Sequence, residues 1–238
     1  MIDRALSRAR AEIAEVGVRV TADQLYYATC RVVLPLHAGP RRLGYLVPRP
    51  LRRSAFDRAL ARRPGPVVSE RLPVLAAATD APDVLDYGLP RLLICQHDGI
   101  AAMLLANDLH MECGTAVLGG TQVVTGLPGL LRAAMESGTT TVYLLHDATS
   151  TGAAWRADVE NRIDAPGRVV ALGLHPDQAR ALHLVRGPAG GAELAAVPPA
   201  HLLRVLRRLL AGGRPPAAST SVRDRVGLGF LSWPGEWP

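Results

Sequence analysis

The residues best suited to chemistry follow an apolar run in the second half of the chain. Residues 143–145 read Tyr-Leu-Leu, and His146, Asp147 and Thr149 lie just beyond them. An apolar run that ends in an acid and a small, hydroxyl-rich turn is typical of a buried parallel strand, which places its carboxylate at the carboxyl edge of a sheet. A magnesium-dependent phosphoryl-transfer site would have a second acid at position 149, where this chain has threonine. The segment therefore predicts a functional sheet edge that is short of carboxylates.

Two other apolar runs, at residues 92–95 and 115–118, also end in polar or glycine residues. The carboxyl ends of parallel strands meet at one edge of a sheet, so the residues after these runs should converge with Asp147. The expected members of this group are Gln96, Asp98, Gly119, Asp147 and Thr149.

Strand and helix patterns alternate from Pro90 onward. Compact apolar runs predict four strands, at residues 92–95, 115–118, 140–145 and 169–172. Helical patterns connect these runs and predict βαβ crossovers, because parallel strands need such connections. The expected fold class is α/β, with a mostly parallel four-stranded sheet flanked by helices within residues 86–186.

The flanking regions predict a helical module and a tail. Residues 1–85 contain three capped or amphipathic helices, which favours an N-terminal helical, winged-helix-like module. Residues 187–238 contain a Gly/Pro/Ala connector, a helix at 201–210 and a tail. Disordered tails rarely contain aromatic residues, so we expect this tail to dock on the body or on a protein partner. Its aromatic residues are Phe230, Trp233 and Trp237.

The strand ends resemble those of the Toprim domain, which topoisomerases and primases share. That family has an acid after the first strand, a glycine after the second and an Asp-x-Asp pair after the third, and its acids hold magnesium. In this chain Gly119 and Asp147 match the pattern, Gln96 replaces the first acid and Thr149 replaces the last. The resemblance implies that Asp147 is a catalytic residue and a metal ligand, with Asp98 as a substitute for the missing acid.

This resemblance covers residues 90–183 and implies a weakened Mg²⁺ site. Neutral Gln96 and Thr149 contribute little charge to a hard cation, so most metal affinity should be lost. The resemblance therefore implies a protein with a degenerate active site, which binds nucleic acid within a larger assembly and cleaves nothing. A metal-dependent DNA-cleaving enzyme and a scaffold that does not bind nucleic acid remain the alternatives.

A second resemblance lies upstream, in the capped helix that contains Tyr26 and Tyr27. It is similar to the paired-tyrosine helix before the Toprim domain in the A subunit of topoisomerase VI and in the related meiotic break-making transesterase. In that family the second tyrosine attacks DNA, which implies a catalytic role for Tyr27. The alternative is that both rings pack in the core.

All 27 cationic side chains are arginine, because the chain contains no lysine. This excludes a P-loop nucleotide site with its lysine and a pyridoxal phosphate Schiff base. Between residues 31 and 71, ten arginines face only two acids, so this segment is more positive than the +6 of the whole chain. Such a basic block predicts a nucleic-acid partner, although a solvated loop is the alternative. The expected contacts are Arg31, Arg41, Arg42, Arg49, Arg52 and Arg53.

Two other chemistries fit parts of the same region. Asp147 followed by Thr151 resembles the first motif of HAD-type phosphatases, in which the aspartate attacks phosphorus. A set of zinc-competent side chains lies nearby, but its spacing is not that of a zinc finger. The set consists of Cys95, His97, His110 and Cys113.

Cysteine usage and hydropathy bear on the compartment. Three cysteines at irregular spacing favour reduced thiols over a disulfide framework. No apolar run approaches the roughly 20 residues of a membrane helix. We therefore expect a cytoplasmic protein that does not insert into membranes.

Overall fold

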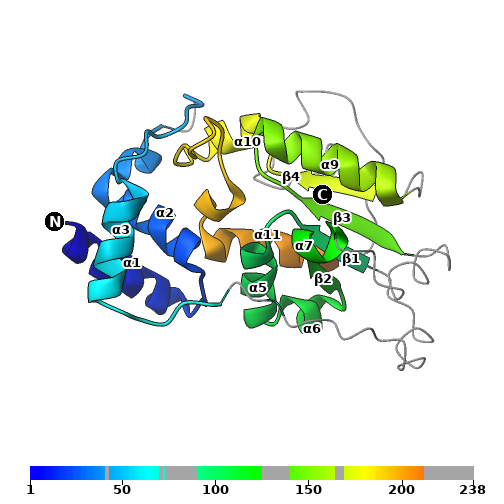
Figure 1. The fold of residues 1–238 in the computed structure, drawn as a ribbon, viewed down its shortest axis with the longest axis horizontal. Helices are drawn as coiled ribbons and strands as arrows, with labels where there is room; N and C mark the ends of the chain where they lie inside the picture. Colours follow the sequence, from blue (N-terminus) through cyan, green and yellow to red (C-terminus); the bar gives the residue numbers. More distant parts are fainter. Residues whose placement is uncertain (41–42, 70–71, 73–90, 125–139, 164–168, 212–238) are drawn as a thin grey trace.

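The computed structural model describes residues 1–40, 43–69, 72, 91–124, 140–163 and 169–211 (Figure 1). Several sequence predictions lie outside these ranges. They concern Arg41, Arg42 and the aromatic tail residues Phe230, Trp233 and Trp237.

The N-terminal region consists of helices α1 (Ile2–Val16), α2 (Ala22–Val33) and α3 (Arg53–Arg62), with a short 3-10 helix η1 (Pro35–Ala38) after α2 (Figure 1). A capping box starts α2, because the Gln24 N–H donates to Thr21 Oγ1 and the Thr21 N–H donates to Gln24 Oε1. Within the described part of residues 1–72 there are isolated β-bridges but no strand. The helical part of the prediction is confirmed, and the winged-helix form is not.

The sheet has four strands, β1 (Arg91–Cys95), β2 (Ala116–Gly119), β3 (Thr141–Leu145) and β4 (Val169–Gly173), in the order β2-β1-β3-β4. All three strand pairs are parallel. In their register Cys95 lies beside both Gly119 and Leu145, so β1, β2 and β3 end at the same level. The α/β fold class with a parallel four-stranded sheet is confirmed.

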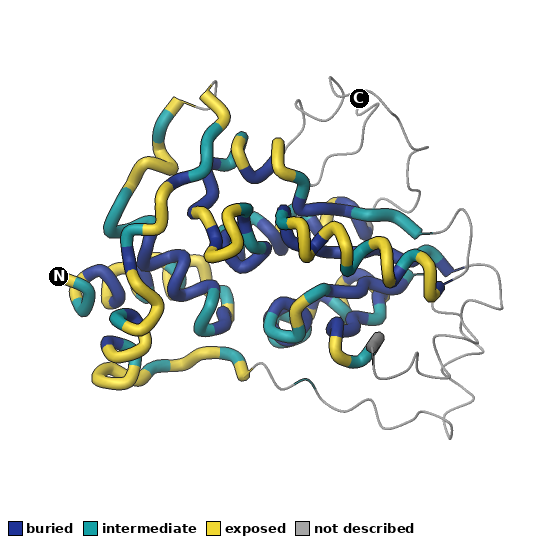
Figure 2. The backbone as a smooth tube through the Cα atoms, turned by 45° about the horizontal axis from the view of Figure 1, so that its top comes forward, coloured by how far each residue is buried: buried dark blue, intermediate teal, exposed yellow. Residues whose placement is uncertain are grey.

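Helices cover both faces of this sheet. They are α5 (Asp98–Ala106), α6 (Leu109–Cys113), α7 (Gly120–Val124), α9 (Ser150–Ile163), α10 (Pro176–Ala181) and α11 (Pro199–Ala211). Neighbouring strand residues face opposite sides, so Leu93 joins the larger core cluster and Leu92 joins a smaller one with Val159 of α9. Both β1 and β3 are buried at four of five residues, whereas α9 exposes one side (Figure 2).

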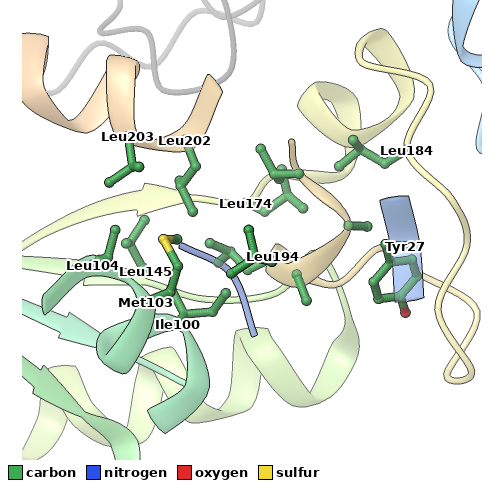
Figure 3. Close-up of a cluster of buried hydrophobic side chains, with 14 of the residues drawn as sticks. Tyr27, Ile100, Met103, Leu104, Leu145, Leu174, Leu184, Leu194, Leu202 and Leu203 are labelled. Carbon is green, nitrogen blue, oxygen red and sulfur yellow. The ribbon is translucent and has the colours of Figure 1, made fainter. Parts of the chain in front are cut away.

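The larger core cluster extends from the sheet to the N-terminal helices. Figure 3 shows Leu202 and Leu203 of α11 with Met103 of α5, while Tyr27 of α2 lies at the other end beside Leu184. The short 3-10 helix η3 (Leu194–Ala196) fills the space between these parts and contacts α2. This packing brings α2 to the carboxyl edge of the sheet.

Among the described helices, none has both the length and the apolarity that crossing a bilayer requires.

Candidate functional site

Asp147 lies directly beyond β3, where it is 4% exposed, and its two carboxylate oxygens and its backbone N–H are all hydrogen-bonded. Its Oδ2 accepts from the Nε2 of His97 at 2.7 Å, and its Oδ1 accepts from the Leu194 N–H at 2.8 Å. Its own backbone N–H donates to the Oε1 of Gln96 at 2.8 Å. Each carboxylate oxygen therefore already has a partner from the protein, and Gln96 positions the acid.

His97 joins β1 to α5 and pairs with Asp147 in a carboxylate–imidazole dyad. The His97 side chain is 51% exposed, whereas that of Asp147 is 5% exposed. The hydrogen bond to Asp147 raises the pKa of His97 above its usual value, and partial burial opposes this effect. The dyad thus favours an imidazolium ring that is open to solvent on one side.

Tyr27 approaches the same edge from α2. Its hydroxyl donates to the Oε2 of Glu193 at 2.8 Å, and the residue is 2% exposed. Burial raises the pKa of the Tyr27 phenol far above its usual value, and the charge of Glu193 adds to this effect. Burial also raises the pKa of the Glu193 carboxyl, although the bond from Tyr27 opposes that shift. In this setting the phenol stays protonated, which is unfavourable for a nucleophile.

Tyr26 packs beside Tyr27 in the core. The two rings meet edge-on with centroids 5.1 Å apart, and the Tyr26 ring meets Phe56 in the same way at 5.3 Å. The Tyr26 hydroxyl donates to the Leu51 carbonyl at 2.6 Å. This is the core packing that the sequence left open as the alternative for the tyrosine pair.

The segment 191–194 connects Tyr27 to Asp147. It pairs with the end of β3 through a bridge between Ala148 and Ala192, and this bridge places Glu193 beside Tyr27. Gly191 allows this approach, because a Cβ there would lie 2.0 Å from the carbonyl oxygen of Ala148. This segment, which leads into η3, thus joins the helical module to the strand end.

Asp98 was expected near Asp147 as a metal ligand, and Thr149 as the residue that replaces one. Both side chains bind backbone N–H groups instead. The Oδ1 of Asp98 accepts from the Thr121 N–H at 3.1 Å. The Oγ1 of Thr149 accepts from the Gly152 N–H at 3.0 Å and so caps α9. Both side chains therefore stabilise helix starts.

These donors do not fit a resident cation. Mg²⁺ prefers several accessible oxygen ligands, whereas the oxygens of Asp147 are buried and hydrogen-bonded. Over the described ranges, no group of three or more His, Cys, Asp or Glu side chains is placed to hold a metal ion. Cys95 and Cys113 are buried free thiols, and burial raises the pKa of both. The engagement of Asp147 is likewise unfavourable for a phosphatase nucleophile paired with Thr151.

The arginines of the basic block differ in their surroundings. Arg31 donates to the Ala196 carbonyl at 2.7 Å, and burial lowers its pKa to about 10. Arg53 pairs with two aspartates. Arg49 and Arg52 are exposed, and no ion pair to a described residue holds them. Among the predicted contacts that the structure describes, these last two are the cations available to a ligand.

Sequence reasoning did not assign His97 to this site, and it missed Glu193. His97 follows the first predicted strand, in the run Gln96-His97-Asp98, but the sequence suggested only a zinc-ligand role for it. Glu193 is the only charged residue between positions 187 and 198, and that is the one signal it offered.

None of the protein-family models, curated proteins or solved structures compared with the chain matches it.

Proposed function

We propose that this protein binds nucleic acid beside the carboxyl edge of its sheet without cutting it. In this proposal the chain is a Toprim-like relative of the topoisomerase VI A family with a degenerate cleavage site. The observation that carries the proposal is the engagement of Asp147, whose two oxygens accept hydrogen bonds from His97 and Leu194. The buried, protonated phenol of Tyr27 supports the same conclusion.

The charge of the chain supports the nucleic-acid part. Its net charge is +6, and Arg49 and Arg52 are exposed without a described ion-pair partner. The charges of Arg49 and Arg53 act on Tyr26, so this cationic side of the helical region lies near the tyrosine pair. A phosphate backbone contacted by arginine at this place would run close to the edge that contains Asp147.

Salt-dependent binding tests this proposal. Fluorescence anisotropy with labelled single-stranded and duplex DNA should show affinity that falls with salt. In the double variant Arg49→Gln/Arg52→Gln, the slope of log K against log salt should become shallower by about two, one for each lost phosphate contact. The control Arg8→Gln/Arg162→Gln removes the same charge from exposed arginines paired with acids in their own helices. An equal effect of both double variants, or binding that does not respond to salt, would contradict the proposal.

A nicking assay tests the absence of cleavage. Supercoiled plasmid with Mg²⁺ or Mn²⁺ should show no nicking that depends on Asp147 or Tyr27. Nicking by the wild-type protein that both Asp147→Asn and Tyr27→Phe abolish would establish the cleaving enzyme instead.

A further inference from the structure

A cavity of about 460 Å³ opens beside the strand end of β3. One part of its lining is on α9 and contains Ala153 and Ala157, and another contains Leu174 and Pro176 at the junction of β4 and α10. The volume falls within the range of small-molecule sites in proteins. Small and apolar side chains form most of these two parts of the lining.

His146 lines this cavity, and one of its ring nitrogens is an unused hydrogen-bond acceptor. The residue is 5% exposed, and its Nδ1 lies 3.0 Å from the backbone carbonyl oxygen of Asp147. Because a carbonyl only accepts, Nδ1 carries the hydrogen, and Nε2 of the neutral ring carries the lone pair. Burial lowers the pKa of His146, which favours this neutral form. Nε2 is buried and has no hydrogen-bond partner among the described residues, which is costly without a donor.

Arg156 and Glu160 add polar groups to the wall on α9. The Nε of Arg156 donates to the Oε1 of Glu160 at 2.7 Å, and both side chains line the cavity. This bond uses one of the five donors of the guanidinium and one carboxylate oxygen. The wall therefore offers a neutralised pair of a donor and an acceptor, which suits an uncharged polar ligand better than an ion.

We propose that this cavity binds a single nucleobase that has an exocyclic amino group. The amino group would donate to the Nε2 of His146, a ring nitrogen or carbonyl oxygen would accept from Arg156, and the ring would lie against Ala157. Nucleobases combine flat faces with donors and acceptors on one edge, which is the pattern that these residues complement. The choice of a nucleobase rests on the proposed function, whereas the need for a ligand with an N–H donor follows from the unpartnered Nε2 of His146.

Titration calorimetry with free nucleosides tests this inference. Cytidine should bind about tenfold more tightly than the riboside of pyrimidin-2-one, whose base has neither the amino group nor a ring N–H, because a buried acceptor discriminates strongly against a ligand without a donor. Ala157→Leu, which fills the cavity from α9, should weaken cytidine binding by about tenfold or more. Ala154→Leu is the matched control, because Ala154 is exposed on the same helix and does not line the cavity.

A second variant tests the acceptor itself. His146→Phe keeps a ring of similar volume and removes Nε2, so it should abolish the preference for cytidine over the pyrimidin-2-one riboside. If this variant does not fold, the comparison of Ala157→Leu with Ala154→Leu still decides the matter. Absence of nucleoside binding, equal binding of cytidine and the pyrimidin-2-one riboside, or equal effects of the two alanine variants would overturn the inference.

A single-stranded oligonucleotide with one 2-aminopurine separates the two sources of the base. If the cavity takes a base from a strand, 2-aminopurine fluorescence should change on binding to wild type and not to Ala157→Leu. Nucleoside binding without oligonucleotide binding would overturn the proposed function and leave the cavity inference intact. Oligonucleotide binding that Ala157→Leu does not affect, in the absence of nucleoside binding, would overturn the cavity inference and leave the proposed function intact.

Discussion

Replacing Asp147 by asparagine should destabilise the fold more at acidic than at alkaline pH. The variant keeps an Oδ1 acceptor for the Leu194 N–H but loses the charge that holds the proton on His97. A hydrogen bond to a charged group contributes roughly 1.5–3 kcal/mol when shielded from water. Because the His97 side chain is 51% exposed, solvent screening reduces the expected loss to about 1 kcal/mol.

The direction of the pH dependence follows from the raised pKa of His97. Its pKa in the folded protein lies above the ordinary value of 6.5, which applies to the unfolded chain. The stabilisation by Asp147 is therefore complete below pH 6.5 and is lost as the pH rises through the folded-state pKa. The difference in unfolding free energy between wild type and Asp147→Asn should be largest at about pH 5 and should nearly vanish at about pH 9.

Urea unfolding followed by circular dichroism at these two pH values measures the effect. The control is the same substitution in a His97→Gln protein, which lacks the titrating ring. In that protein Asp147→Asn should show no such pH dependence. Asp147→Ala should cost about 1–3 kcal/mol more than Asp147→Asn at either pH, because it leaves the buried Leu194 N–H without an acceptor. A destabilisation by Asp147→Asn that is equal at both pH values, or larger at alkaline pH, would refute this reasoning.

Three further variants test the contacts around the site. Tyr27→Phe should lower the unfolding free energy by about 0.5–1.5 kcal/mol, because it removes the hydrogen bond to Glu193; an unchanged urea midpoint would contradict this. Arg31→Ala should destabilise by about 1–3 kcal/mol, because it removes the bond to Ala196, and leave the salt slope of DNA binding unchanged. A shallower slope would instead make Arg31 a phosphate contact. Phe56→Ala should cost about 3–5 kcal/mol in thermal or urea unfolding, since Phe56 is 0% exposed. A loss below about 1 kcal/mol would mean that the site is not tightly packed.

The strands show how much of the fold local sequence predicts. The run at 92–95 corresponds to β1 (Arg91–Cys95), and the run at 169–172 corresponds to β4 (Val169–Gly173), each within one residue at either end. Hydrophobic periodicity and turn residues act over a few positions, so they locate such elements well. The short helix α6 (Leu109–Cys113) was not expected, since five residues show too little periodicity.

The site was predicted only in part, because its contacts span long sequence separations. Asp147 and Gln96 do meet at the strand edge, but as a hydrogen-bonded pair of residues rather than as parts of a cation site. The partners of Asp147 include Leu194, which lies 47 positions away in a connector without a chemical motif. Tyr27 and its partner Glu193 are 166 positions apart. Such pairs form only after the helices and the sheet have packed.

The sequence by itself therefore determined the α/β class, the parallel strands and the placement of Asp147 at a sheet edge, since each follows from local patterns of apolar and turn residues. Only the tertiary structure decided what surrounds that acid. Packing of η3 against α2 and the bridge from Ala148 to Ala192 bring Glu193 and Leu194 to the edge. Burial then engages the oxygens of Asp147 and keeps Tyr27 protonated, because buried polar groups must find partners within the protein.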